Sequence, residues 1–153
     1  IALDRVRDPG NLGTIIRTAD SAGADGIVLV GETTDPFSME ATRASMGSIF
    51  NVPLTKMQVD EFLAWQKSWS GLTVGTHLEG ASDFRTIDYK SQPVLLLMGN
   101  EQQGLPQELA SVCDQLALIP MHGAADSLNL AIATGVMLFH MGKKLPPIEP
   151  GAE

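Results

Sequence analysis

Residues 117–130 read Ala-Leu-Ile-Pro-Met-His-Gly-Ala-Ala-Asp-Ser-Leu-Asn-Leu. The stretch begins as a short apolar strand, continues as a loop, and brings Ser127 and Asn129 to the start of a long apolar helix over about 127–142. Either side chain is a candidate helix cap. An unpaired amide at Asn129, among apolar neighbours, would cost about 1–3 kcal/mol, which favours a functional role for this residue.

The same alternation of strands and helices extends over most of the chain. The expected elements share short apolar runs, or apolar residues at helical spacing, between Gly, Pro or Asp. Strands are predicted at 1–6, 26–30, 72–76, 93–98 and 115–119, with a weaker sixth at 52–57, and further helices at about 11–22, 38–46, 58–68 and 105–112. We therefore expect one α/β domain over residues 1–145, with three α/β/α layers and a mainly parallel sheet.

Four details follow from this assignment. Asn11 is the expected N-cap of the first helix, and Gly23 its expected stop. The last helix is apolar nearly all round, so we expect it to be buried on most sides. The proline-rich tail 146–153 is expected to be disordered.

Composition limits the class of protein. The chain has 153 residues, of which 44% are hydrophobic, so it can bury a proper core. No apolar run reaches the ~18 residues of a membrane span, and no signal peptide is evident, which predicts a cytoplasmic protein. The chain begins at Ile1 within a strand pattern, so we expect that an upstream segment is absent.

Cysteine and histidine give no sign of a metal site. Cys113 is the single cysteine and is expected to be a packed thiol in a reducing compartment. His77, His122 and His140 are too scattered for a zinc signature, so no metal is expected. Trp65 and Trp69, on one helical face, are expected in a core or interface.

The formal net charge of −8 argues against an extended phosphate-binding surface. This argument weakens if a basic domain is missing, or if the arginines converge in space, because the distribution of charge matters more than its sum. The arginines in question are Arg5, Arg7, Arg17 and Arg43.

Ligands of open α/β sheets bind beyond the carboxyl ends of the strands, so the loops that follow 1–6, 93–98 and 115–119 are the candidate site. The loop after 1–6 leads into the predicted helix 11–22. On this helix Arg17 lies opposite the apolar stripe, so it faces solvent, a groove or another chain. A solvated arginine and an ordinary cap would explain the segment. The functional alternative is that Arg17 and the free amides at the helix start hold a phosphate group.

The second segment, Met98-Gly99-Asn100-Glu101-Gln102-Gln103-Gly104, follows a strand. Its glycines let a ligand approach the backbone closely, although a structural turn is an equally open interpretation. The segment is neither a dinucleotide G-x-G-x-x-G fingerprint nor a P-loop.

Three segments, residues 11–17, 98–104 and 117–130, resemble in this order the motifs of the SpoU (TrmH-type) RNA 2′-O-ribose methyltransferases of the SPOUT superfamily. The resemblance implies transfer of a methyl group from S-adenosylmethionine to a ribose 2′-hydroxyl of structured RNA, with ribosomal RNA favoured over transfer RNA. The catalytic residues that it implies are Asn11, Arg17, Glu101, Ser127 and Asn129. The cofactor-binding residues that it implies are Met98, Gly99, Asn100, Gly104, Ile119, Met121, Ser127 and Leu128. Many of these enzymes carry a smaller residue in place of Gln102 or Gln103.

The resemblance also implies a trefoil knot over roughly residues 95–142, which ordinary topology rules would not predict. It implies a homodimer in which Arg17 serves a cofactor held by the other protomer, and an RNA-binding segment upstream of this chain. The family proposal assigns deprotonation of the hydroxyl to this arginine. Because a guanidinium stays protonated, we expect Arg17 to stabilise developing alkoxide charge instead.

Two alternatives remain open from the sequence. One is a non-catalytic RNA-binding module with the same fold. The other is a doubly wound nucleotide-binding oxidoreductase, although its phosphate fingerprint is missing.

Overall fold

The computed structural model describes residues 1–142, so the expected tail 146–153 lies outside the described residues. The strands are β1 Ala2–Asp4, β2 Ile27–Val30, β3 Leu54–Met57, β4 Leu72–Thr76, β5 Ser82–Asp83, β6 Val94–Met98 and β7 Gln115–Leu118. The α-helices are α1 Pro9–Ser21, α2 Met39–Ser45, α3 Val59–Gln66, α4 Gln107–Ala110 and α5 Leu130–Met141. Two 3₁₀ turns, Ser48–Phe50 and Phe84–Thr86, complete the assignment.

The seven strands form one sheet in the order β3-β2-β1-β6-β4-β7-β5, and every strand pair is parallel. The expected parallel sheet is therefore confirmed, including its weaker sixth strand, which is β3. The edge strand β5 escaped prediction because it consists of two polar residues. In the sheet, β4 lies between β6 and β7, so three loops at the carboxyl edge become neighbours.

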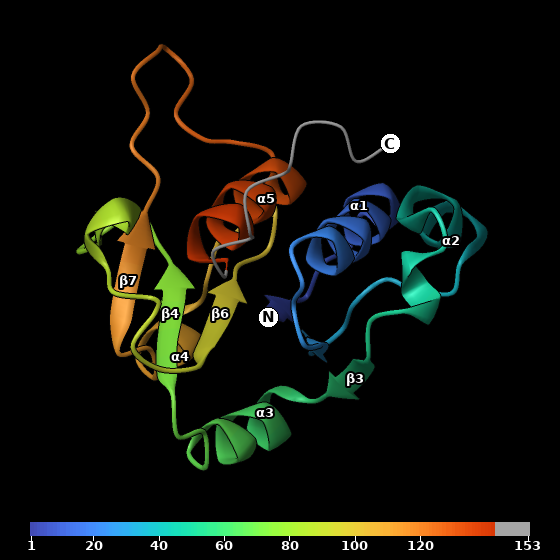
Figure 1. Cartoon of the computed structure of the whole chain (residues 1–153), viewed down its shortest axis with the longest axis horizontal. Coiled ribbons are helices and arrows are strands. Elements are labelled where there is room, and N and C mark those ends of the chain that lie inside the picture. The colour runs from blue at the N-terminus through green and yellow to red at the C-terminus, as the bar shows by residue number, and fades with distance from the viewer. Residues whose placement is uncertain (143–153) are drawn as a thin grey trace, which may run out of the picture.

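Helices cover both faces of this sheet, which confirms the three-layer architecture (Figure 1). Within β6, Leu96 and Met98 pack with α1 and α5, whereas Leu95 and Leu97 pack with α3 and α4. A strand buried on both faces must be apolar at successive positions, which explains its continuous run of apolar residues. Helix α2 lies outside these layers and packs on α1.

Helix α1 begins earlier than expected, and Asn11 is not its N-cap. Asp8 is the N-cap, because its carboxylate accepts a hydrogen bond of 2.8 Å from the backbone N–H of Asn11. Pro9 follows in the first turn, where its missing N–H costs nothing. The side chain of Asn11 is therefore free for another partner. Gly23, with φ of +73°, ends the helix as predicted.

Helix α5 begins at Leu130, three residues later than expected, and Asn129 is its N-cap. The Asn129 Oδ1 accepts hydrogen bonds from the backbone N–H groups of Ala131 and Ile132, at 2.9 and 3.2 Å. Asn129 is exposed, so the expected cost of a buried unpaired amide was wrong. Helix α4 is also shorter than predicted, with Pro106 as its N-cap.

The expectation that α5 is buried on most sides is wrong within a single chain. Helix α5 lies beside α1 (Figure 1). On this inner side, Met137 is fully buried in the core formed with α1 and the sheet. On its outer side, Ile132 is 55% exposed and Phe139 is 58% exposed. An apolar helix with two large exposed side chains is typical of an interface.

The cysteine and the two tryptophans are packed, as the sequence predicts. Cys113 donates to the Leu109 carbonyl, and burial raises the pKa of this thiol to about 12, as suits a packed cysteine. Trp65 and Trp69 are partly buried and pack against the core on the α3 side of the sheet. No helix of the described part is long and apolar enough to cross a membrane. Residues 1–142 also contain no cluster of three His, Cys, Asp or Glu that could hold a metal ion.

Candidate functional site

A pocket of about 640 Å³ opens beyond the carboxyl ends of β4, β6 and β7. This volume lies within the range of ~300–1,000 Å³ that is usual for small-molecule sites. The loops 76–79, 98–105 and 117–128, with the start of α5, form its walls. All positions expected to bind the cofactor line it, namely Met98, Gly99, Asn100, Gly104, Ile119, Met121, Ser127 and Leu128.

The loop after β6 is folded tightly against itself. A Cβ on Gly99 would lie 2.2 Å from the Leu105 nitrogen and 2.3 Å from the Gly104 carbon, so only glycine fits at this position. Gly104 has φ of +67°, which also favours glycine. Two backbone hydrogen bonds between Asn100 and Gly104, of 3.2 and 3.0 Å, close the loop. The loop therefore offers a compact wall of backbone to a ligand.

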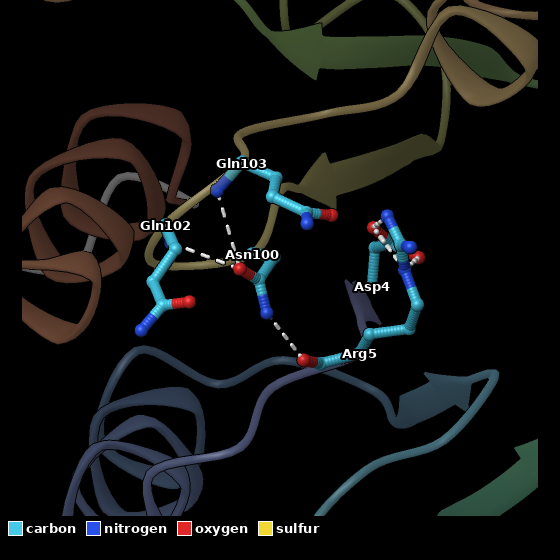
Figure 2. Close-up of polar contacts among 5 residues, drawn as sticks. All are labelled: Asp4, Arg5, Asn100, Gln102 and Gln103. Carbon is cyan, nitrogen blue, oxygen red and sulfur yellow. Dashed lines mark hydrogen bonds and ion pairs between the residues drawn. The ribbon is translucent and has the colours of Figure 1, made fainter.

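The side chain of Asn100 fastens this loop to the end of β1 (Figure 2). Its Nδ2 donates a hydrogen bond of 2.6 Å to the Arg5 carbonyl. Its Oδ1 accepts from the backbone N–H groups of Gln102 and Gln103, at 2.9 and 3.2 Å. Asn100 lines the pocket as expected, but its amide is engaged in holding the loop.

Arg5, whose carbonyl accepts the hydrogen bond from Asn100, has an unusual backbone conformation. Arg5 has φ of +45°, in the left-handed region that non-glycine residues rarely adopt. Its guanidinium folds back onto Asp4, with three contacts of 3.0–3.2 Å to a carboxylate residue that is only 2% exposed (Figure 2). These hydrogen bonds raise the pKa of Arg5. The Nε and Nη2 groups of Arg5 are therefore engaged by Asp4, and this pairing fixes the direction of its guanidinium.

Two further hydrogen bonds bring the first motif to the other two. The backbone N–H of Asp8 donates to Glu101 Oε1 at 3.3 Å, and the Asn129 Nδ2 donates to Asn11 Oδ1 at 3.1 Å. Asn11, Glu101 and Asn129 therefore gather at the start of α1. Ser127 lines the adjacent pocket, where its hydroxyl donates to Asp126.

Arg17 does not join this group within one chain. It lies on α1 six residues beyond Asn11 and, as the helical pattern predicts, it is exposed. It does not line the pocket, and it forms no ion pair with any residue between 1 and 142. Within residues 1–142, Arg17 is therefore a solvated side chain whose charge is open to a partner.

Sequence reasoning missed one wall of the pocket, which consists of Thr76 at the end of β4 and the three residues that follow, His77-Leu78-Glu79. Backbone N–H of Glu79 donates to His77 Nδ1 at 3.1 Å, which gives the segment a tight turn. The rule that ligands bind beyond strand ends applies to β4 as well. The missing information was the position of β4 between β6 and β7.

The charges of the pocket walls are of one sign. Glu79, Glu101 and Asp126 line the pocket, and among residues 1–142 no lysine or arginine does so. The walls also offer apolar surface from Leu78, Ile119 and other residues. Such a pocket suits a ligand with apolar and cationic parts and disfavours one with several phosphates.

The profile of the SpoU rRNA Methylase family matches residues 1–139. The chain is 35% identical over 141 residues to the 23S rRNA (guanosine(2553)-2′-O)-methyltransferase RlmP of Bacillus subtilis. The aligned region covers 92% of this chain and 56% of that relative. The chain is also 37% identical to a 23S rRNA (uridine(2479)-2′-O)-methyltransferase of Streptomyces viridochromogenes, over 91% of this chain and 50% of the relative. It thus spans about half the length of the curated relatives that it matches.

Solved structures give the same result. The AdoMet-bound rRNA methyltransferase from Sinorhizobium meliloti superposes with a TM-score of 0.89 at 66% sequence identity, over 92% of this chain and 54% of that chain. The SpoU methyltransferase AviRb from Streptomyces viridochromogenes, in complex with AdoMet, superposes with a TM-score of 0.81 at 35% identity, over 92% and 57% of the two chains.

Proposed function

Because this chain belongs to the SpoU rRNA Methylase family, we propose that it transfers a methyl group from S-adenosylmethionine to a ribose 2′-hydroxyl of RNA. Ribosomal RNA is the favoured substrate, since the printed names of the first two relatives specify 23S rRNA. The observation that carries the proposal is the pocket, which collects every expected cofactor position and adjoins Asn11, Glu101 and Asn129.

The pocket suits S-adenosylmethionine in shape and in charge. The lack of a Cβ at Gly99 leaves the loop 99–104 close-packed, and Ile119 and Leu128 supply apolar surface for an adenosine. Glu79, Glu101 and Asp126 complement a positively charged sulfonium ion. The same carboxylates would repel the pyrophosphate of a dinucleotide, which disfavours the oxidoreductase alternative.

When bound, the cofactor supplies a methyl group that is activated by its sulfonium leaving group. The chain must align a ribose hydroxyl with this methyl and stabilise the negative charge that develops on the hydroxyl oxygen as its proton passes to water. Asn11 and Asn129 hold each other at the start of α1, where one amide can orient the ribose. Glu101 is fixed by the Asp8 N–H. Arg17 supplies a permanent positive charge, because a guanidinium keeps its protons.

We further propose a homodimer whose two sites are shared between protomers. Three observations support it: the exposed Ile132 and Phe139 on α5, the packing of α5 beside α1, and the position of Arg17 outside its own pocket. A second copy that covers α5 and α1 would bring Arg17 to the partner's pocket.

The trefoil knot over residues 95–142 and a cytoplasmic location are also proposed. The knot is supported by the superposition of 92% of this chain on SpoU methyltransferases. The location is supported by the proposed ribosomal RNA substrate.

Two measurements test the proposed activity. Calorimetry with S-adenosylhomocysteine should show binding at micromolar to millimolar ligand, whereas a folded protein that gives no heat would favour the non-catalytic RNA-binding module. Incubation with methyl-labelled cofactor and ribosomal RNA should yield label in a dinucleotide that resists alkaline hydrolysis, because a 2′-O-methyl group blocks cleavage. Binding of NAD without binding of S-adenosylhomocysteine would support the oxidoreductase instead.

A further inference from the structure

One surface of the chain has no role in the proposed site. Around α2, four large apolar side chains are unusually exposed: Phe37 by 66%, Met39 by 70%, Met46 by 70% and Phe50 by 81%. We call these four residues, with the exposed Arg43 among them, the α2 face. The other large exposed apolar side chains of the described residues belong to the pocket or to α5, so the α2 face needs an explanation of its own.

The α2 face is directed outward by the way in which α2 packs. The buried residues of α2 are the small Ala41 and Ser45. A Cβ on Gly13 of α1 would lie 2.2 Å from the Ala41 carbonyl oxygen, so the backbones of the two helices approach each other without room for larger groups. Met39 and Arg43, four residues apart, therefore lie on the outer side of the helix.

The backbone at the end of α2 holds Met46 in a strained conformation. Met46 has φ of +50° and, with Arg5, is one of two non-glycine residues between 1 and 142 that have positive φ. Its side chain gains little packing in return, because 70% of the residue is exposed. Strained residues that are not stabilised by burial are often found at functional sites.

The α2 face adjoins Arg17. On α1, Gly13 lies against residues 41–45, and Asp20 is held by Ser48 and Asn51, which lower the pKa of its carboxyl. Arg17 falls between Gly13 and Asp20 on the same side of α1, four residues after one and three before the other. Arg17 therefore emerges beside the turn that contains Met46.

We propose that the α2 face binds unpaired nucleotides of the RNA substrate next to the ribose that Arg17 serves. Bases stack on the exposed rings of Phe50 and Phe37, and the Arg43 guanidinium contacts a phosphate. This assignment rests on the proposed function, because Arg17 is its link to the reaction.

Charge favours RNA over a protein partner as the occupant. In a chain of formal charge −8, Arg43 lies within the α2 face and Arg17 lies beside it. Three carboxylates also border this surface: Asp35 accepts from the backbone N–H of Phe37 at 2.8 Å, Asp20 accepts from Asn51 at 3.2 Å, and Glu40 lies 3.7 Å from the position of a Cβ on Gly10. Arg43 and Arg17 form no ion pair with any residue between 1 and 142, so both guanidinium groups remain open to a phosphate. Exposed rings combined with arginine suit a strand of stacked bases and phosphates, which needs no base-specific contact.

Substitutions on the α2 face separate stacking from general apolar contact. We would measure the affinity of the protein for a short unpaired oligoribonucleotide by fluorescence anisotropy. Phe50→Leu should weaken binding at least fivefold, whereas Phe50→Trp should retain it, because only an aromatic ring stacks. The double variant Arg43→Ala/Phe50→Ala should lose at least about 10-fold. The matched control is Lys67→Ala, an exposed lysine at the end of α3, which should change affinity less than twofold.

Salt dependence tests the role assigned to Arg43. Loss of one phosphate contact lowers the slope of log affinity against log salt by about 0.7 for single-stranded RNA. Arg43→Ala should show this change, and Lys67→Ala should leave the slope unaltered.

Several outcomes would overturn the proposal. These are no measurable RNA binding by the unaltered protein, equal binding by Phe50→Leu and Phe50→Trp, or a double variant within twofold of the unaltered protein. A lower mass of the double variant in light scattering would make the α2 face an interface between protein chains. Calorimetry with S-adenosylhomocysteine runs in parallel, so a protein that binds RNA without the cofactor product would refute the proposed activity and leave the RNA surface standing.

Discussion

Replacing Asn100 by aspartate removes one hydrogen-bond donor from the loop 99–104 and leaves the side chain almost the same shape. In the native loop, the Asn100 Nδ2 donates to the Arg5 carbonyl at 2.6 Å. In the variant, a carboxylate oxygen faces that carbonyl oxygen. The other contacts persist, because an aspartate still accepts from the N–H groups of Gln102 and Gln103.

The expected effect follows from the partner that is left unsatisfied. A half-buried carbonyl that loses its donor costs about 1–3 kcal/mol, and two oxygens in contact add repulsion. If the cofactor binds only when the loop is fastened to β1, its affinity falls by roughly 5- to 150-fold. The sheet pairs do not involve this contact, so the domain should stay folded, as circular dichroism would show.

The control for Asn100→Asp is Gln102→Glu. This variant adds the same charge to the same loop, but the side-chain amide of Gln102 makes no hydrogen bond with residues 1–142. Calorimetry with S-adenosylhomocysteine should show a large loss for the first variant and a small change for the second. Equal losses would assign the effect to charge alone, and an affinity of Asn100→Asp within twofold of the native value would refute the fastening role.

Three further expectations follow from the site and the core. Arg17→Ala should lower methyl transfer by ~10² or more while cofactor affinity changes less than twofold, and a loss of less than threefold would remove Arg17 from the mechanism. Mixed dimers of Arg17→Ala and Asn129→Ala protomers should regain activity if sites are shared, since one site then keeps both residues; confirmed heterodimers that stay inactive would contradict sharing. Burial raises the pKa of Cys113 to about 12, so its contribution to stability is complete below the pKa of the unfolded thiol and is lost as pH rises toward 12. At pH 8 the native thiol should resist alkylation that the urea-unfolded chain undergoes, and equal rates would contradict its burial.

The layers of the fold were predictable because burial leaves a clear pattern in the chain. The run in β6 is apolar at every position since Leu95 and Leu96 face opposite layers, each of which is closed by helices. The edge strand β5 had no such pattern, because Ser82 and Asp83 join the sheet through backbone pairing with β7. A pattern of apolar side chains cannot reveal a strand that contributes none.

The sequence predicted the three motifs of the candidate site, but it did not predict every loop that lines the pocket. Loops after β1, β6 and β7 were identified, whereas residues 76–79 were missed, because strand order is a property of tertiary pairing. Capping and function were treated as competing explanations of Asn129. The structure shows one side chain in both contacts: Oδ1 caps α5 and Nδ2 binds Asn11.

The pairing of β1 with β6 has a consequence for the synthesis of the protein. Ala2 pairs beside Leu97, so β1 cannot pair with β6 until residues up to about 98 have left the ribosome. The bond between Asn11 and Asn129 waits longer still. Pairings so distant in sequence slow folding and leave early segments exposed meanwhile. A nascent chain stalled before residue 129 should therefore be sensitive to proteases and unable to retain the cofactor product.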